Sequence, residues 1–217
     1  MVIVAVHTDT VREPTTFAVG IAAVSSDRRD RVLSLAKIDD RQRSLCAGLA
    51  LTACLRAVGL PADAEIVRDE HGKPRLRAYP EWQFSLSHSG DYAVCALTDT
   101  PVGVDVEQRR SIEVTRLADR FFTAQEAALL ASLPKAEQET AFLRLWTAKE
   151  SVLKAQGSGL SGGLSSVPIA YGDMLRAPEP WLLKEYALPG YVLTVCGTGA
   201  FPDTLTVISS YDSVPLR

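Results

Sequence analysis

The sequence has little net charge and no long apolar run, and each absence excludes a class of function. Its 23 basic and 26 acidic residues leave a net charge of −3. No global field therefore attracts nucleic acid or a membrane surface, so any phosphate site must be local. No stretch reaches the ~18 consecutive apolar residues of a membrane-spanning helix, and residues 1–6 lack the basic lead of a signal peptide. We expect a monomeric, cytoplasmic protein without a nucleic-acid or membrane partner.

The sequence also lacks closely spaced cysteines. Its cysteines all sit inside apolar runs, and no pair has the spacing of a zinc knuckle or a redox dithiol: Cys46, Cys54, Cys95 and Cys196. We expect buried free thiols in a reducing compartment. What is present, 217 residues of which 47% are hydrophobic and 23% charged, is the balance of a folded chain with a substantial core.

Hydrophobic patterning predicts a mixture of strands and helices. We predict strands at residues 2–6, 17–24 and 102–107, a hairpin of two strands within 84–97, and further strand-like segments near the C-terminus. We predict helices at residues 40–58, 112–121, 124–132 and 138–156, with a charged stretch at 25–31 leading into helical sequence.

Two segments of the chain resemble each other. Residues 89–97 (SGDYAVCAL) are similar to residues 188–196 (LPGYVLTVC), and each segment lies downstream of a helix that ends in Gly-Leu. An internal duplication or ordinary hairpin chemistry could each produce this match. A duplication would make two α+β halves that meet near position 101, and an interface between halves favours a ligand site.

Two familiar motifs fail their context. Residues 157–162 satisfy the dinucleotide pattern GxGxxG, and residues 159–163 satisfy the nucleophile pattern GxSxG. Both motifs follow a predicted helix, whereas each mechanism requires a preceding strand. We interpret the segment as a loop at the end of a helix.

The strand-like sequence VGVDVE carries a pair of acids. The period of two in a strand places Asp105 and Glu107 on one face, and Val104 and Val106 on the other. Adjacent carboxylates repel each other, so a cation should lie between them, and Mg²⁺ prefers such oxygen ligands. A solvated edge strand, or pairing with the two arginines that follow, is the alternative.

The helix at 138–156 carries a third acid. Glu150 lies four residues after Trp146, at the edge of the apolar stripe, which predicts a partly buried carboxylate. Lys154 lies four residues further on and can either neutralise Glu150 or hold a phosphate oxygen beside a bound metal. With Lys149 and the acid pair, these residues form a candidate phosphoryl-transfer site.

Other side chains could bind phosphate. Ser87, His88 and Ser89 supply two hydroxyls and an imidazole at one end of the predicted hairpin. A basic cluster precedes the core helix and could be an anion site or a solvated surface: Arg28, Arg31, Arg41 and Arg43, with Ser44.

Five blocks of sequence, taken together, resemble one known family. They are GKP at 72–74, FSLSHSG at 84–90, VGVDVE at 102–107, FFTAQE at 121–126 and WTAKESVLKA at 146–155. In this order and spacing they look like the signature of surfactin-type 4′-phosphopantetheinyl transferases, and the resemblance covers most of residues 25–165. It implies an α+β fold of two similar subdomains, residues 1–101 and 102–217, with pseudo-twofold symmetry and the active site between them.

The resemblance implies transfer of the 4′-phosphopantetheine arm of coenzyme A to a serine of an apo carrier protein. The acyl or peptidyl carrier would belong to polyketide, nonribosomal-peptide or fatty-acid synthesis, and Mg²⁺ or Mn²⁺ would assist release of adenosine 3′,5′-bisphosphate. A non-catalytic coenzyme A or nucleotide-binding module of the same fold, or an unrelated Mg²⁺ hydrolase, is the alternative. The presence of all three acids and Lys154 disfavours the binding module.

The resemblance also implies a role for individual residues. Those implied to bind metal are Asp105, Glu107 and Glu150, and those implied to contact phosphates are Lys154, Ser87 and His88. The residues implied to lie on the adenine side of the ligand are Gly72, Lys73 and Pro74. Those implied to hold the 3′-phosphate are Arg28, Arg31, Arg43 and Ser44. The family often has Lys where this chain has Arg28 and Arg31. Either Glu126 or Glu150 would accept the serine proton.

The carrier should dock near residues 112–133, between the two acidic blocks. Phe121, Phe122, Leu129 and Leu130 would present apolar side chains to a visiting helix. The alternative is that both phenylalanines are core residues, which we favour for Phe121. Arg120, like Arg116, could attract an acidic carrier.

Overall fold

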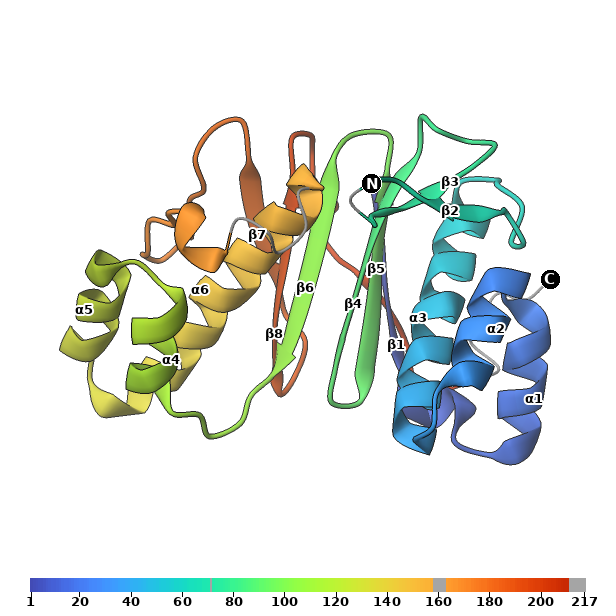
Figure 1. The fold of residues 1–217 in the computed structure, drawn as a ribbon, viewed down its shortest axis with the longest axis horizontal. Coiled ribbons are helices and arrows are strands. Elements are labelled where there is room, and N and C mark those ends of the chain that lie inside the picture. The colour runs from blue at the N-terminus through green and yellow to red at the C-terminus, as the bar shows by residue number, and fades with distance from the viewer. Residues whose placement is uncertain (71, 158–162, 211–217) are drawn as a thin grey trace.

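Two sheets lie side by side in this protein, and one long helix covers a face of each (Figure 1). The structure is a computed structural model that describes residues 1–70, 72–157 and 163–210. The elements of the first half are β1 (Val2–His7), η1 (Thr8–Val11), α1 (Pro14–Ala23), α2 (Ser26–Ser34), α3 (Ile38–Ala57), β2 (Ile66–Arg68), β3 (Pro74–Leu76), β4 (Gln83–Ser89) and β5 (Tyr92–Thr98). Those that follow are β6 (Val102–Gln108), α4 (Val114–Phe121), α5 (Ala124–Ser132), α6 (Lys135–Gln156), η3 (Leu164–Ser166), β7 (Leu182–Tyr186), β8 (Tyr191–Gly197) and β9 (Thr206–Ile208).

The two halves share one topology. The first sheet has the order β4-β5-β1-β9 and the second the order β6-β8-β7, while β2 and β3 form a separate ribbon. In each half a strand, a long helix and a hairpin follow one another, and the second strand of the hairpin pairs antiparallel with the first strand. The α+β fold of two similar subdomains is therefore confirmed.

The two segments that resemble each other occupy equivalent hairpins. Gly90 and Gly190 each turn with a positive φ, 53° and 80°, which favours glycine. The rings of Tyr92 and Tyr191, which open the equivalent strands β5 and β8, meet edge to face with centroids 5.0 Å apart. This shared position in the topology favours duplication over chance similarity.

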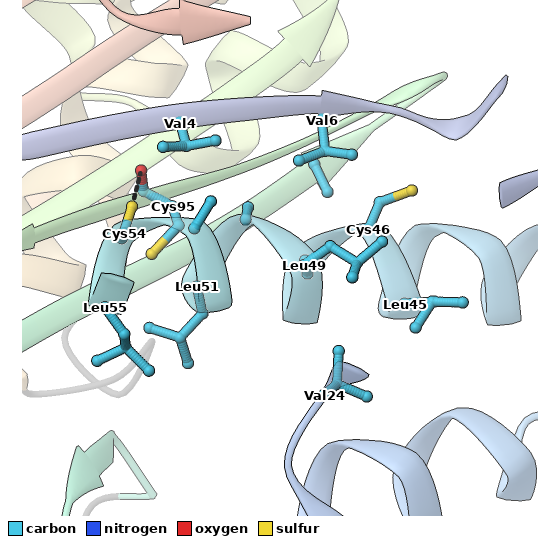
Figure 2. Close-up of a cluster of buried hydrophobic side chains, with 14 of the residues drawn as sticks. Val4, Val6, Val24, Leu45, Cys46, Leu49, Leu51, Cys54, Leu55 and Cys95 are labelled. Carbon is cyan, nitrogen blue, oxygen red and sulfur yellow. Dashed lines mark hydrogen bonds between the residues drawn. The ribbon is translucent and has the colours of Figure 1, made fainter. Parts of the chain in front are cut away.

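Helix α3 forms the core of the first half, as Figure 2 shows. Side chains such as Leu45 and Leu49 are buried between the first sheet and helices α1 and α2, and each contributes roughly 1.5–3 kcal/mol. The Cys54 thiol donates to the Cys95 carbonyl oxygen at 3.7 Å. Cys46, Cys54, Cys95 and Cys196 are all buried and free, as predicted.

The prediction of a strand at residues 17–24 is wrong, because this segment lies in α1. Pro14 occupies the first turn of α1, where its fixed φ favours a helix and its missing N–H costs nothing. The apolar run that follows does not alternate with polar residues, and Gly20 packs against Leu45 of α3. Helix packing, rather than the β-branched residues, decides the conformation. The charged stretch at 25–31 was predicted to lead into a helix, but the helix begins within it: α2 starts at Ser26, and the Ser25 hydroxyl caps it.

The C-terminal strand β9 returns to the first sheet. It pairs parallel with β1, with Val4 opposite Thr206 and Val6 opposite Ile208. The predicted division into residues 1–101 and 102–217 therefore does not describe this strand. Helix α6 ends at Gly157, whose φ of 76° is left-handed, and residues 158–162 of the two rejected motifs lie outside the described residues. No helix in the described ranges is long and apolar enough to cross a membrane.

Strands β4 and β6 run side by side where the halves meet, yet they belong to different sheets (Figure 1). Serine hydroxyls of β4 replace the missing backbone pairing by accepting hydrogen bonds from backbone N–H groups of β6. The pairs are Ser85 with Val104 at 3.0 Å, Ser87 with Val106 at 3.3 Å and Ser89 with Gln108 at 3.1 Å. We call these three serines the serine seam.

Strand β6 presents different residues to its two faces, as its alternation predicts. Val104 and Val106 enter a core cluster that contains residues of both sheets, such as Ile3 and Leu193. Gly103 faces α6: a Cβ atom there would lie 1.8 Å from the Ser151 carbonyl oxygen. Only glycine therefore allows α6 to pack this closely on β6, and this contact brings Glu150 and Lys154 toward the seam.

We expect Gly103→Ala to destabilise the protein by more than the ~1–3 kcal/mol typical of an overpacked core, because the clash is with backbone rather than with a flexible side chain. Urea unfolding measures the loss. Gly199→Ala is the control, because its nearest neighbour would be the Thr100 hydroxyl at 3.6 Å, an ordinary contact. Equal stabilities of the two variants would contradict the close packing of α6 on β6.

Candidate functional site

A cavity of about 570 Å³ lies between the halves, beside the serine seam. Its lining comes from both halves, with α2, α3 and β2 on one side and β6 and α6 on the other. Arg28 and Arg31 supply a basic wall, whereas Asp105 and Glu107 supply an acidic wall. Such a site can hold an anion and a cation at neighbouring positions.

Asp105 stands at the centre of the acidic wall. Only 4% of the residue is exposed, and its Oδ1 accepts hydrogen bonds from Lys154 at 2.6 Å and from the Ser87 hydroxyl at 2.7 Å. Its Oδ2 is buried and has no hydrogen-bond partner among the described residues. A buried carboxylate oxygen without a partner is costly, so this atom calls for a cation or a donor.

The two other acids lie within electrostatic reach of Asp105. Burial raises the pKa of Glu150, and the charges of Asp105 and Glu107 add to this effect. Burial also raises the pKa of Glu107, with Asp105 contributing, although a hydrogen bond from Ser89 opposes the shift. The three acids therefore lie near enough to influence one another's charge.

These three acids fit a hard divalent cation by their chemistry. All three offer carboxylate oxygens, and Asp105 retains the unpartnered Oδ2. Within the described ranges, no group of three or more His, Cys, Asp or Glu side chains is gathered tightly enough to enclose a metal ion. The positive charge on Asp105 in this structure is that of Lys154.

Lys154 reaches across to the strand that carries the acids. Besides Asp105, its ammonium contacts the Ser87 hydroxyl at 3.2 Å and the Val104 carbonyl oxygen at 3.1 Å. It lines both this cavity and a smaller neighbour of about 280 Å³. The sequence analysis left Lys154 either to neutralise Glu150 or to hold a phosphate oxygen, whereas in this structure its ion pair is with Asp105.

The basic wall contains two buried polar atoms that have no hydrogen-bond partner within residues 1–70, 72–157 and 163–210, namely Arg28 Nε and Ser44 Oγ. Burial, with the nearby charge of Arg31, lowers the pKa of Arg28. Gly48 makes room for this arginine, since a Cβ atom there would lie 2.6 Å from Arg28 Cγ. Unpaired donors among like charges are the features of an anion site.

Two arginines of the predicted cluster have other partners. Arg43 donates to Asp40 at 2.6 Å and lines a separate cavity, and Arg41 donates to the Leu35 carbonyl oxygen. The structure adds Arg68 of β2 to the basic wall, which the sequence analysis missed. Its position four residues before Gly72 was the available signal, since Arg68 donates to the Gly72 carbonyl oxygen.

The smaller cavity brings the predicted adenine-side turn next to α6. Its lining includes Gly72, Lys73, Pro74 and Glu150. Lys73 donates to the Ala155 carbonyl oxygen at 3.0 Å, and burial, together with Arg75, lowers its pKa to about 8. The turn and the helix therefore form two walls of one space.

Ser87 and His88 both line the larger cavity. The Ser87 hydroxyl donates its hydrogen bond to Asp105, so it supports the acid rather than offering a free donor. Burial, with the charges of Arg43 and Lys154, lowers the pKa of His88. His88 is therefore neutral at pH 7 and can donate one N–H.

Glu126 is held away from these cavities, and its oxygens are already engaged. Oε1 accepts from Lys149 at 2.7 Å and from the Ile169 amide, while Oε2 accepts from the Thr123 amide and hydroxyl at the start of α5. Burial alone would raise its pKa, but these bonds lower it. The structure does not bring Glu126 to Glu150 and Lys154.

The predicted docking segment is partly core. Leu130 is 1% exposed and Phe122 stacks on Phe142, so the expectation that both face a visiting carrier is wrong. Apolar residues of α4 and α5 are needed to bury the outer face of α6. Arg120 is exposed over the ring of the half-buried Phe121 and remains available on the surface.

Comparisons with known proteins match both halves of the chain. Residues 12–100 match the family model described as 4′-phosphopantetheinyl transferase, N-terminal, and residues 101–196 match that of the 4′-phosphopantetheinyl transferase superfamily. The chain is 36% identical to 4′-phosphopantetheinyl transferase psf-1 of Bacillus pumilus, covering 80% of this chain and 78% of that protein. It is 30% identical to 4′-phosphopantetheinyl transferase Sfp of Bacillus subtilis strain 168, covering 86% and 88%, and 37% identical to AcpT of Salmonella typhimurium, covering 82% and 89%.

We expect Glu126→Ala to reduce stability by about 3–5 kcal/mol, because it leaves Lys149, which is 0% exposed, as an unpaired buried charge. Urea unfolding measures this, with Glu65→Ala as the control. The exposed pair of Glu65 with Arg77 should contribute less than about 1 kcal/mol. A stable but inactive Glu126→Ala variant would instead identify Glu126 as the base.

Proposed function

Because this chain belongs to the 4′-phosphopantetheinyl transferase family, we propose that the cavity between its halves is where it acts on coenzyme A. The protein is a transferase that moves the phosphopantetheine arm of coenzyme A to a carrier protein. The observation that carries the site assignment is the contact of Lys154 with Asp105 at the serine seam, opposite the wall of Arg28 and Ser44.

The reaction exchanges the phosphoanhydride bond of coenzyme A for a phosphate ester bond to serine. The serine oxygen of the carrier bonds to the phosphorus next to the pantetheine arm. The bond from that phosphorus to the bridging pyrophosphate oxygen breaks, and the electron pair leaves on adenosine 3′,5′-bisphosphate. The serine proton passes to a base. Charge accumulates on the pyrophosphate oxygens, so positioning and electrostatics dominate catalysis.

Glu150 is the base that we assign. It lines the smaller cavity together with Lys154, and a base must lie within reach of the proton that it accepts. Lys154 stabilises the negative charge on the pyrophosphate. Glu126 is less suited, because its carboxylate is committed to Lys149 and to backbone amides.

Asp105, Glu107 and Glu150 are the residues that would hold Mg²⁺ or Mn²⁺. Such a cation, when bound, neutralises charge on the pyrophosphate oxygens. The unpartnered Asp105 Oδ2 and the mutual repulsion of the acids support this assignment. A non-catalytic coenzyme A-binding module would require the basic wall but not these acids.

Arg28, Arg31 and Ser44 are assigned to the 3′-phosphate, with Arg68 as an addition from the structure. Gly72, Lys73 and Pro74 are assigned to the adenine side, and His88 to a phosphate. Arg43 is the weakest member of the predicted set, because Asp40 already neutralises it.

We propose that the carrier belongs to polyketide, nonribosomal-peptide or fatty-acid synthesis. A panel of apo carriers would identify which of these it is. The buried free cysteines fit a reducing compartment, and we propose a cytoplasmic monomer. Docking near residues 112–133 stays a prediction, with Arg120 as the residue that can contribute to it.

The function is tested by incubating the protein with coenzyme A and apo carriers and measuring intact mass. We expect the carrier to gain the mass of the phosphopantetheine arm, and excess chelator or Asp105→Ala to abolish the gain. Glu137→Ala, an exposed acid at the other end of α6, is the control and should retain activity. Full activity in chelator would refute the metal assignment, and no mass gain on any carrier would refute the transfer.

We expect Arg31→Ala to weaken the binding of coenzyme A about ten-fold or more, since a hydrogen bond to a charged group contributes roughly 1.5–3 kcal/mol. The affinity for dephospho-coenzyme A, which lacks the 3′-phosphate, should fall much less. Calorimetric titration of both ligands measures this. Arg43→Ala should have the smaller effect because of its Asp40 partner. Equal losses for both ligands would show that Arg31 serves another part of the molecule.

A further inference from the structure

Ser89, the last residue of the serine seam, has a contact that neither the sequence analysis nor the proposed site uses. Its hydroxyl accepts the Gln108 amide at 3.1 Å and donates to Glu107 Oε2 at 2.8 Å. Within the described residues, this is the hydrogen bond that the Glu107 carboxylate makes. Asp105, by contrast, has both Ser87 and Lys154.

The backbone around Ser89 is held firmly against the second half. Gly90, with a φ of 53°, leaves no room for a side chain, since a Cβ atom would lie 2.6 Å from both Gln108 Oε1 and the Tyr191 hydroxyl. The Asp91 amide donates to the Tyr191 hydroxyl at 2.9 Å. The hairpin tip therefore fixes the Ser89 hydroxyl in one place relative to β6.

A carboxylate near the end of a strand and only half-buried has several accessible rotamers. Glu107 also lies beside Asp105, and like charges drive its side chain away from the site unless another contact holds it. Side chains that hydrogen-bond a metal-binding carboxylate orient it, and their removal typically weakens metal binding 10–100-fold.

We propose that Ser89 is a positioning residue that holds Glu107 through Oε2 so that its carboxylate stays directed toward the divalent cation. This inference rests on the proposed metal role of Asp105, Glu107 and Glu150. Ser89 acts through Glu107 and needs no contact with coenzyme A.

The chain offers a matched control in Ser85. It belongs to the same seam and accepts the Val104 amide at 3.0 Å, as Ser89 accepts the Gln108 amide, but it donates to no acidic side chain of the part of the chain that the structure describes. Ser85→Ala and Ser89→Ala therefore each remove one seam hydrogen bond, and only the second variant releases an acid.

The test compares wild type, Ser85→Ala and Ser89→Ala in the full chain. Mn²⁺ binding in the presence of coenzyme A is measured by electron paramagnetic resonance, and the Mg²⁺ concentration for half-maximal transfer by kinetics. We expect Ser89→Ala to weaken both metal values by about ten-fold or more. We expect Ser85→Ala to leave both metal values unchanged. Thermal unfolding shows whether the two variants lose similar stability, and Ser89→Thr, which keeps the hydroxyl, should recover metal binding.

Unchanged metal binding in Ser89→Ala would overturn the proposal, as would the same weakening in Ser85→Ala and Ser89→Ala. The first result assigns Ser89 to the fold alone, and the second assigns the effect to the seam as a whole. A wild-type protein that neither binds Mn²⁺ nor responds to Mg²⁺ would instead overturn the proposed metal site itself, so the two failures are distinguishable.

Discussion

The contact between β4 and β6 determines how everything else in the site is arranged. Two strands from different halves lie side by side, and the serine seam satisfies the β6 amides that no neighbouring strand reaches. Unpaired buried amides are costly, so the seam stabilises the interface while keeping the strands apart. The same hydroxyls of Ser87 and Ser89 hold Asp105 and Glu107. One set of hydrogen bonds thus joins the halves and orders the acids.

The pKa shifts of the charged groups show which charges would stabilise the two walls of the cavity. Burial, together with the charges of the neighbouring acids, raises the pKa of Glu107 and of Glu150, while burial and neighbouring cations lower the pKa of Arg28 and of His88. Each wall would be stabilised by charge of the opposite sign. A divalent cation and a polyanionic pyrophosphate together supply both charges, and coenzyme A carries the second.

Local sequence patterns succeeded where the periodicity was clear and failed where packing decides. The alternation of VGVDVE correctly placed Val104 and Val106 in the core and both acids on the opposite face. The segment at 17–24 was wrong because its β-branched residues suggested a strand, whereas Pro14 and packing on α3 make it helical. The prediction that Leu130 faces a carrier was wrong for a related reason. The sequence of a short amphipathic helix does not show which neighbour covers its apolar face.

The sequence by itself determined the family, the α+β class and the common strand face of Asp105 and Glu107, because spaced motifs on strands and helices are local properties. Only the tertiary structure decided which of these groups meet. In the structure Arg43 pairs with Asp40, Arg68 lines the basic wall, and Glu126 pairs with Lys149. It also revealed the serine seam. The serine seam joins the halves across their interface, and the close helix–strand contact at Gly103 brings Lys154 to Asp105, 49 positions away in the sequence. Long-range geometry of this kind is set by packing, not by any local period.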